Sequence, residues 1–247
     1  MKKSIAVIGI ISVVSFCTPL SVLASPPQNV TIEMEKQPVQ QAKTVDEFLT
    51  DPFYKDLPKD AEKIKFYKDL EVFKKENPNL TIEQIVEHFD NIRGFGYEEA
   101  KAVWMELTPA ERRLVIAQPA FALITDSVRK KAHDYTVNNY GYSGAGDESD
   151  AFRHAVWNLL MCKYTGKPWA KLMADAHEDK TEEYFNKVFP DGFTGRQHTQ
   201  MDLHNNEKGR DCWNILIDPF NYFLTDGDLQ NRVIAKIRAG EMMKLHD

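Results

Sequence analysis

Three histidines and several carboxylate and amide residues stand close together in the second half of the sequence. Asp150, His154 and Asn158 are spaced four residues apart, so a helix would place their side chains along one face. Two later segments, Ala176–Asp179 and Met201–Arg210, add further histidine, carboxylate and amide groups. Imidazole nitrogen and carboxylate oxygen are the usual ligands of divalent transition metals, and the same groups serve as general acids and bases. This composition is typical of a hydrolytic metal site or of a metal-free acid–base cluster.

The candidate residues fall into possible metal ligands and possible catalytic or substrate-positioning residues. A divalent ion, zinc or manganese, would activate a water molecule for attack on a phosphoryl or acyl centre. His154 or Glu178 would act as the general base, and Arg153 would bind a negative group or orient Glu178. The candidate metal ligands are His154, His177, Asp202 and His204. The candidate catalytic and substrate-positioning residues are His154, Glu178, Arg153, Asn205 and Asn206.

The spacing of these residues also allows a purely structural interpretation. The sequence has no H-E-x-x-H motif, in which two ligands share a helical face. His177 and Glu178 are adjacent, so on a helix they point about 100° apart. A buried network of polar groups, with Arg153 paired to Glu178 or Asp202, would fix helix packing without any catalysis. A functional site therefore requires three helices to converge.

A glycine-rich turn over 140–146 precedes the first of these helices. The acidic residues Asp147, Glu148 and Asp150 follow it directly, and they would repel a phosphate group. Helix capping and compensation of the helix dipole explain these acids better, and cation binding is the one functional alternative that they leave open. His198 lies in a polar run that we expect to be an exposed loop. We expect no functional role for His88, His133 and His246.

The elements that must position these side chains are predicted to be helices. Hydroxyl residues at Thr44, Thr81 and Thr108 each precede a Glu or Gln by three positions, which is the capping-box pattern of a helix start. We find no run of alternating β-branched residues and no Asn-Gly hairpin signal, so the expected fold class is all-α. Helices are expected over 120–138 and 150–162, within 169–189, over 201–216, and after Thr225, with a loop over 191–195.

The first part of the chain has the features of a secretory signal peptide. Lys2 and Lys3 precede an apolar run over 5–16, and a small-residue end at Ala24 is followed by polar residues. We therefore expect 1–24 to be removed and the protein to be exported, to a periplasm or to the outside of the cell. The expected organisation continues with a flexible linker over 25–43, a helical N-terminal region over 44–118 and a compact helical domain over 119–247 that carries a buried polar cluster.

Charge and cysteine content limit the partners. The net charge is −6, and removal of Lys2 and Lys3 would make it −8, so nucleic acid is not a favoured partner. No apolar run beyond the signal peptide is long enough to span a membrane. The substrate or protein partner stays unknown at this stage. Cys162 and Cys212 either form a disulfide, as an oxidising compartment permits, or remain two buried thiols.

Three sequence blocks resemble a known family. The blocks are D-A-F-R-H over 150–154, A-H-E over 176–178 and M-D-x-H-N-N-x-x-G-R over 201–210. They resemble a domain of unknown function in bacterial secreted proteins, which also occurs at the C-terminus of polymorphic-toxin-like proteins. The resemblance implies no settled activity.

Two functions remain open. We expect an exported hydrolase acting on a phosphodiester, an ester or an envelope polymer. The alternative is a non-catalytic envelope or host-interaction protein whose polar cluster is structural.

Overall fold

The computed structural model describes residues 42–92, 98–220 and 223–247. The predicted signal peptide and the predicted linker up to residue 41 lie outside these residues, as do residues 93–96 of the turn that N-I-R-G-F-G over 91–96 predicts. The last linker residues, Ala42 and Lys43, are described. Ala42 is buried, and its N–H donates a hydrogen bond of 2.9 Å to the hydroxyl of Tyr54.

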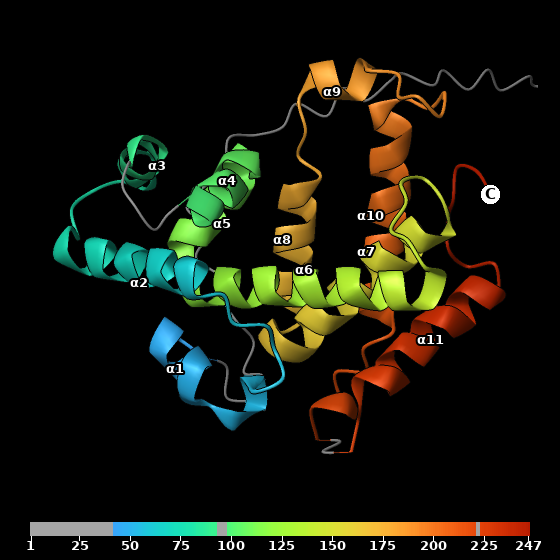
Figure 1. Cartoon of the computed structure of the whole chain (residues 1–247), viewed down its shortest axis with the longest axis horizontal. Helices are drawn as coiled ribbons and strands as arrows, with labels where there is room; N and C mark the ends of the chain where they lie inside the picture. Colours follow the sequence, from blue (N-terminus) through green and yellow to red (C-terminus); the bar gives the residue numbers. More distant parts are fainter. Residues whose placement is uncertain (1–41, 93–97, 221–222) are drawn as a thin grey trace, which may run out of the picture. The chain divides into compact units, whose positions relative to one another are not determined.

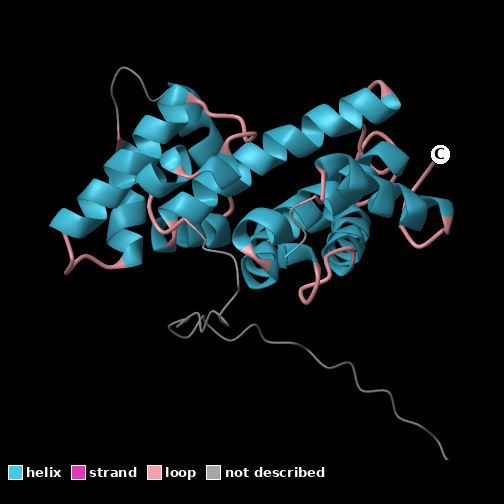
Figure 2. Cartoon of the chain, turned by 90° about the horizontal axis from the view of Figure 1, so that it is seen from below, coloured by secondary structure: helices cyan, strands magenta, loops and turns pink. Residues whose placement is uncertain are grey.

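Helices make up the described part of the chain, which contains no strand, so the fold is all-α (Figure 2). The first helices are α1 (Val45–Thr50), the 3₁₀ turn η1 (Pro52–Tyr54), α2 (Ala61–Glu76), α3 (Ile82–Asn91), α4 (Glu98–Glu106) and α5 (Pro109–Ala117). The later helices are α6 (Pro119–Tyr140), α7 (Glu148–Thr165), α8 (Lys167–His177), α9 (Glu182–Asn186), α10 (Gly195–Asp211), η2 (Asp218–Phe220) and α11 (Asp226–Arg238).

Helix α7 lies at the centre of the C-terminal part. It contacts α6, α8, α10 and α11, and nearly all of its side chains are buried, as its apolar composition predicts (Figure 1). The earlier helices reach this group through α6, which contacts α1, α2 and α5. The described residues all belong to one compact unit, so the division expected after residue 118 stays a prediction.

The predicted helix starts are mostly confirmed. Thr81 and Thr108 both make complete capping boxes, and Thr225 caps α11 in the same way. Thr44 caps α1, but Glu47 accepts its hydrogen bond from Lys43 rather than from the cap residue itself. These local patterns are decided within a few residues, which is why they can be seen in the sequence.

The prediction for α10 was wrong at both ends. The helix begins at Gly195, six residues before the expected start, and ends at Asp211 rather than at residue 216. Thr194 caps it with a complete capping box formed with Gln197, a signal that the sequence contains and that was missed. His198 therefore lies in the first turn of a helix, where it is 7% exposed, and not on an exposed loop.

Close packing of α10 against α7 requires a glycine. A Cβ atom built on Gly209 would lie 2.2 Å from the backbone oxygen of Ala155, a distance at which the two helices would have to separate. Gly209 and Ala155 thus let the two backbones approach, and this approach brings the polar faces of α7 and α10 together.

Both cysteines of the described residues are free and buried, so Cys162 and Cys212 do not form a disulfide in this structure. In the part of the chain that is described, no helix has the length and apolar character needed to cross a membrane.

Candidate metal centre

Asp150, His154 and Asp202 form a triad of side chains that can hold a metal ion. Each offers one ligand atom, and these atoms lie within 4.8 Å of one another. The Nε2 atom of His154 is 3.4 Å from the Oδ1 atom of Asp150 and also 3.4 Å from the Oδ1 atom of Asp202. Two ligands bound tetrahedrally at zinc distances lie about 3.3 Å apart, so the spacing suits such an ion.

The origin of the triad is helical spacing combined with helix packing. Asp150 and His154 are four residues apart on α7, and Asp202 comes from α10, which packs against α7. The glycine turn before α7 contributes by capping: Asp147 accepts the N–H of Asp150, and the N–H of Gly146 donates to Oδ2 of Asp150 at 2.7 Å. The capping interpretation is thus confirmed for Asp147, whereas Asp150 belongs to the triad.

A chain of amide side chains fixes the proton of His154. The guanidinium of Arg210, which can only donate, donates to Oδ1 of Asn158 at 2.7 Å. The Nδ2 atom of Asn158 must then point away from Arg210, and it donates to Oδ1 of Asn206 at 2.6 Å. The same oxygen lies 3.3 Å from Nδ1 of His154. Because that oxygen can only accept, Nδ1 carries the imidazole proton.

This tautomer leaves the other nitrogen of His154 without a proton. Its lone pair then faces the carboxyl oxygens of Asp150 and Asp202, and of these two oxygens Oδ1 of Asp150 also accepts from Arg153. Oδ1 of Asp202 is buried and has no hydrogen-bond partner. A divalent cation is the partner that satisfies all three atoms at once, and a hydrogen bond to the far ring nitrogen is usual for metal-bound histidine.

Burial and mutual repulsion perturb the acids around the triad. The pKa of Asp202 is raised well above its usual value, first by burial and then by the negative charges of Glu178 and Asp150. The pKa of Glu178 is also raised, mainly by burial, and its Oε1 atom has no hydrogen-bond partner. Without a cation these carboxyl groups retain protons more readily than exposed ones, whereas a bound cation would favour their charged forms.

Burial and nearby charges also shift the pKa values of His154 and Asp150. Burial lowers the pKa of His154 well below its usual value, and the positive charge of Arg153 acts in the same direction. The imidazole is therefore neutral, as a metal ligand must be. Burial raises the pKa of Asp150, while Arg153, which pairs with it, opposes the shift.

Two residues that the sequence suggested for the site lie outside it. Nε2 of His204 is 2.8 Å from the carbonyl oxygen of Glu241. The side chain of Asn205 makes two hydrogen bonds of 2.9 Å with the backbone of Met243. Both residues face the C-terminal segment rather than the triad. Their neighbours Asp202 and Asn206 face α7, which the sequence alone does not distinguish because all four residues stand within five positions.

His177 is near the site but is held by another residue. Its Nδ1 atom lies 2.8 Å from Oε1 of Glu111, a buried residue whose role in the sequence was the capping box of α5. The hydroxyl of Thr108 in the same box donates to the carbonyl oxygen of Ala176 at 2.7 Å, which attaches α5 to the end of α8. The structure therefore does not bring His177 into the triad.

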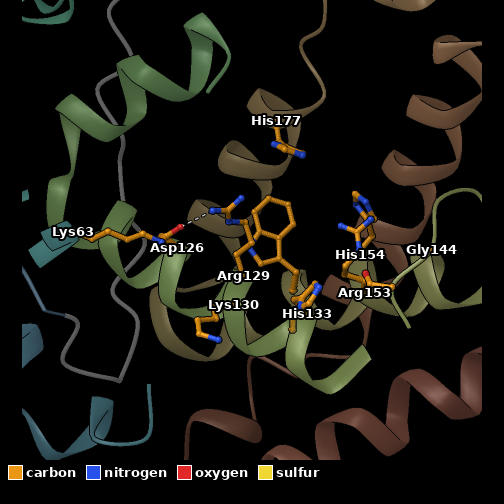
Figure 3. A pocket seen from close by; sticks show the side chains of 12 residues that line it. Lys63, Asp126, Arg129, Lys130, His133, Gly144, Arg153, His154 and His177 are labelled. Atoms are coloured by element: carbon orange, nitrogen blue, oxygen red, sulfur yellow. Dashed lines mark hydrogen bonds and ion pairs between the residues drawn. The ribbon is translucent and has the colours of Figure 1, made fainter. Parts of the chain in front are cut away.

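A cavity of about 470 Å³ lies beside the triad, and His154 and Arg153 are among the residues that line it (Figure 3). Its lining also includes His133, for which no role was expected, and His177. In Figure 3, Lys63, Asp126 and Arg129 lie across the cavity from His154 and Arg153. The other lining residues are Lys130, Ala132, Ser143, Gly144 and Trp157.

Comparison with known proteins gives a family but no activity. No curated protein and no solved structure matches the chain. One family model matches residues 112–240, just over half of the chain, and this range includes α6 to α11 and the whole triad. The protein therefore belongs to the DUF6973 family, a domain of unknown function.

Proposed function

We propose that this protein is a divalent-metal-dependent hydrolase that acts on an ester bond outside the cytoplasm. One observation carries the proposal: the unprotonated nitrogen of His154 faces an oxygen of Asp150 and an oxygen of Asp202, each at 3.4 Å, and the buried Asp202 oxygen has no hydrogen-bond partner. A purely structural network would be expected to pair its buried acceptors with donors, because an unsatisfied one costs about 1–3 kcal/mol. Zinc or manganese fits a site of one imidazole and two carboxylates.

The metal ion and the residues around the triad would have different roles in the proposed hydrolysis. A bound divalent ion would supply Lewis acidity that polarises the bond to be hydrolysed. Glu178 is the proposed general base, because its buried oxygen has no partner and its raised pKa lets it accept and hold a proton from an attacking water. Arg153 lines the cavity and is the proposed contact for a negatively charged oxygen of the substrate.

Export is part of the proposal. The basic residues Lys2 and Lys3, the apolar run after them and the small residue Ala24 support cleavage before Ser25. The resemblance of the three sequence blocks to domains of secreted and toxin-like proteins agrees with an enzyme that works away from the cytoplasm, although by analogy only.

The test is hydrolysis by the mature chain loaded with Zn²⁺ or Mn²⁺. We expect release of nitrophenol from bis(4-nitrophenyl) phosphate or from 4-nitrophenyl butyrate, and loss of this activity with chelator. Glu178→Gln should lower kcat by about 10²- to 10⁴-fold without loss of bound metal. The matched control is Asp175→Asn, on the same helix but paired with Lys171 at the surface.

Metal-loaded protein that hydrolyses neither substrate would contradict the proposed activity. Full activity in Glu178→Gln would remove Glu178 as the base while leaving the metal site intact. Of these two results, only the absence of hydrolysis by metal-loaded protein would favour the second hypothesis, a non-catalytic envelope or host-interaction protein.

A further inference from the structure

The cavity beside the triad has a charge opposite to that of the whole protein. Four cationic side chains line it, and the only carboxylate in the lining is Asp126. The complete chain carries a net charge of −6. The cationic residues are Lys63, Arg129, Lys130 and Arg153. A concentration of positive charge in the hollow of an acidic protein favours an anionic ligand at that position.

The existing ion pairs leave this positive charge only partly compensated. Asp126 pairs with both Lys63, at 2.8 Å, and Arg129, at 2.9 Å, and the second partner of Lys63 is the exposed Glu99 at 3.6 Å. Lys130 pairs with Asp134, but both side chains are about half exposed and the pair is correspondingly weak. Arg153 pairs with Asp150 of the triad, and of these acidic partners only Asp126 itself lines the cavity, so the described lining has more cations than carboxylates.

The size and lining of the cavity limit the class of ligand further. A cavity of about 470 Å³ falls within the range of small-molecule pockets, about 300–1,000 Å³, and is too small for a folded polymer. Trp157 and Ala132 add apolar surface to its lining. Arginine forks match the oxygens of a phosphoryl group, and a phosphate monoester carries close to two negative charges where a carboxylate carries one.

We propose that this cavity binds the phosphoryl group of a small phosphate ester, with its organic part against Trp157. His154 and Arg153 line the same cavity, so the phosphoryl group would lie next to the triad. The inference rests on the proposed function, since it names the substrate class of that hydrolase. The phosphoryl group has two sources, a soluble ester or a lipid headgroup, and both present the same chemistry.

The test measures binding with the metal removed, so that it does not depend on catalysis. Phenyl phosphate is titrated into the mature chain in excess chelator by calorimetry, with benzoate as the ligand that keeps the ring but carries one charge. Vesicles containing phosphatidylglycerol provide the lipid arm by co-sedimentation. The variant is the double substitution Arg129→Gln, Lys130→Gln. The matched control is Lys171→Gln, Arg196→Gln, which removes the same charge from two surface pairs.

We expect phenyl phosphate to bind more tightly than benzoate and its affinity to fall by about tenfold or more in the cavity variant but not in the control. Vesicle binding that falls in the cavity variant alone would support the inference and identify a lipid headgroup as the source. Equal losses in the two double variants would overturn it, because only overall charge would then matter. Absence of binding in both arms would also overturn it, even if metal binding and hydrolysis of 4-nitrophenyl butyrate were found.

Discussion

At the scale of single residues, the side chain of Asn206 determines which nitrogen of His154 carries the proton. Arg210 orients Asn158, Asn158 orients Asn206, and Asn206 fixes the proton of His154 on Nδ1. None of these three residues is a metal ligand, yet together they turn the bare nitrogen toward the two carboxylates. Such outer contacts commonly set the affinity of a metal site.

Asn206→Ala should therefore weaken metal binding by about 10- to 100-fold, because His154 loses the group that fixes its tautomer. Isothermal titration of the chelated protein with Zn²⁺ or Mn²⁺ measures this change. Asn205→Ala is the matched control, since its side chain bonds only to Met243. It should lower the melting temperature and leave the metal affinity unchanged. Equal affinity losses in the two variants would show that Asn206 has no specific role.

Residue types that carry the chemistry could be identified from the sequence, but their partners could not. His154 and Asp202 were expected as ligands and do meet. Asp150 shares the face of His154 by its spacing, although it was not placed among the ligands. His204 and Asn205 were set apart from Asp202 and Asn206 only by the position of the C-terminal segment, which local spacing does not reveal.

At the scale of helices, the site depends on how closely α10 approaches α7. Gly209→Ala should destabilise the protein by about 1–3 kcal/mol, because the new methyl group would collide with the backbone of Ala155. Chemical denaturation followed by circular dichroism measures the loss. Gly227→Ala in α11 is the control: its nearest atom would be at 3.5 Å, so the substitution should be neutral or slightly stabilising. Equal effects of the two substitutions would contradict the close approach.

A partly buried ion-pair cluster attaches α11 to α6 and α7. Asp226 accepts from Lys163 at 2.7 Å and from Tyr135 at 2.9 Å, and it pairs with Lys131 at 2.5 Å. Burial acts to raise the pKa of Asp226, but the hydrogen bonds and charges of the two lysines outweigh it and lower the pKa. The stabilisation is thus present above the unfolded-state pKa, about 4, and is lost as the pH falls through the folded-state value.

Asp226→Asn should lower the free energy of unfolding by about 3 kcal/mol at pH 7, because two partly buried lysines lose their partner. The difference from the wild type should shrink as the pH falls below about 4. Urea denaturation at pH 7 and at pH 3 measures both values. The exposed pair of Lys130 and Asp134 provides the control, where Asp134→Asn should cost less than about 1 kcal/mol. A difference that stays constant with pH would contradict the assigned role of Asp226.

Helix existence was predictable where the signal is local. Capping residues such as Thr81, Thr108 and Thr225 mark helix starts within four positions. The register between helices was not predictable, because it depends on contacts such as Gly209 against Ala155, which join positions more than fifty residues apart. His198 shows the same limit: a polar segment looked exposed, but α10 turns this side chain inward to within 3.0 Å of Asp191.

The whole molecule combines an acidic chain with a basic cavity and a carboxylate-rich metal centre beside it. The triad can hold a cation, and the cationic lining of the cavity suits the anion that we propose there. The all-α fold provides both through one helix, because α7 carries Asp150 and His154 into the triad and Arg153 into the cavity. The family has no assigned activity, so the metal is the feature on which the functional account depends.

Metal content tests that account most directly. The mature chain is purified without chelator and without a His tag, and elemental analysis is made of the wild type, Asp202→Asn, His154→Ala and His204→Ala. We predict about one equivalent of zinc or manganese in the wild type and in His204→Ala, and its loss from the two triad variants. A wild-type protein without metal, whose melting temperature does not change on addition of divalent cations, would contradict the metal centre. Metal kept in Asp202→Asn but lost from His204→Ala would contradict the assignment of its ligands.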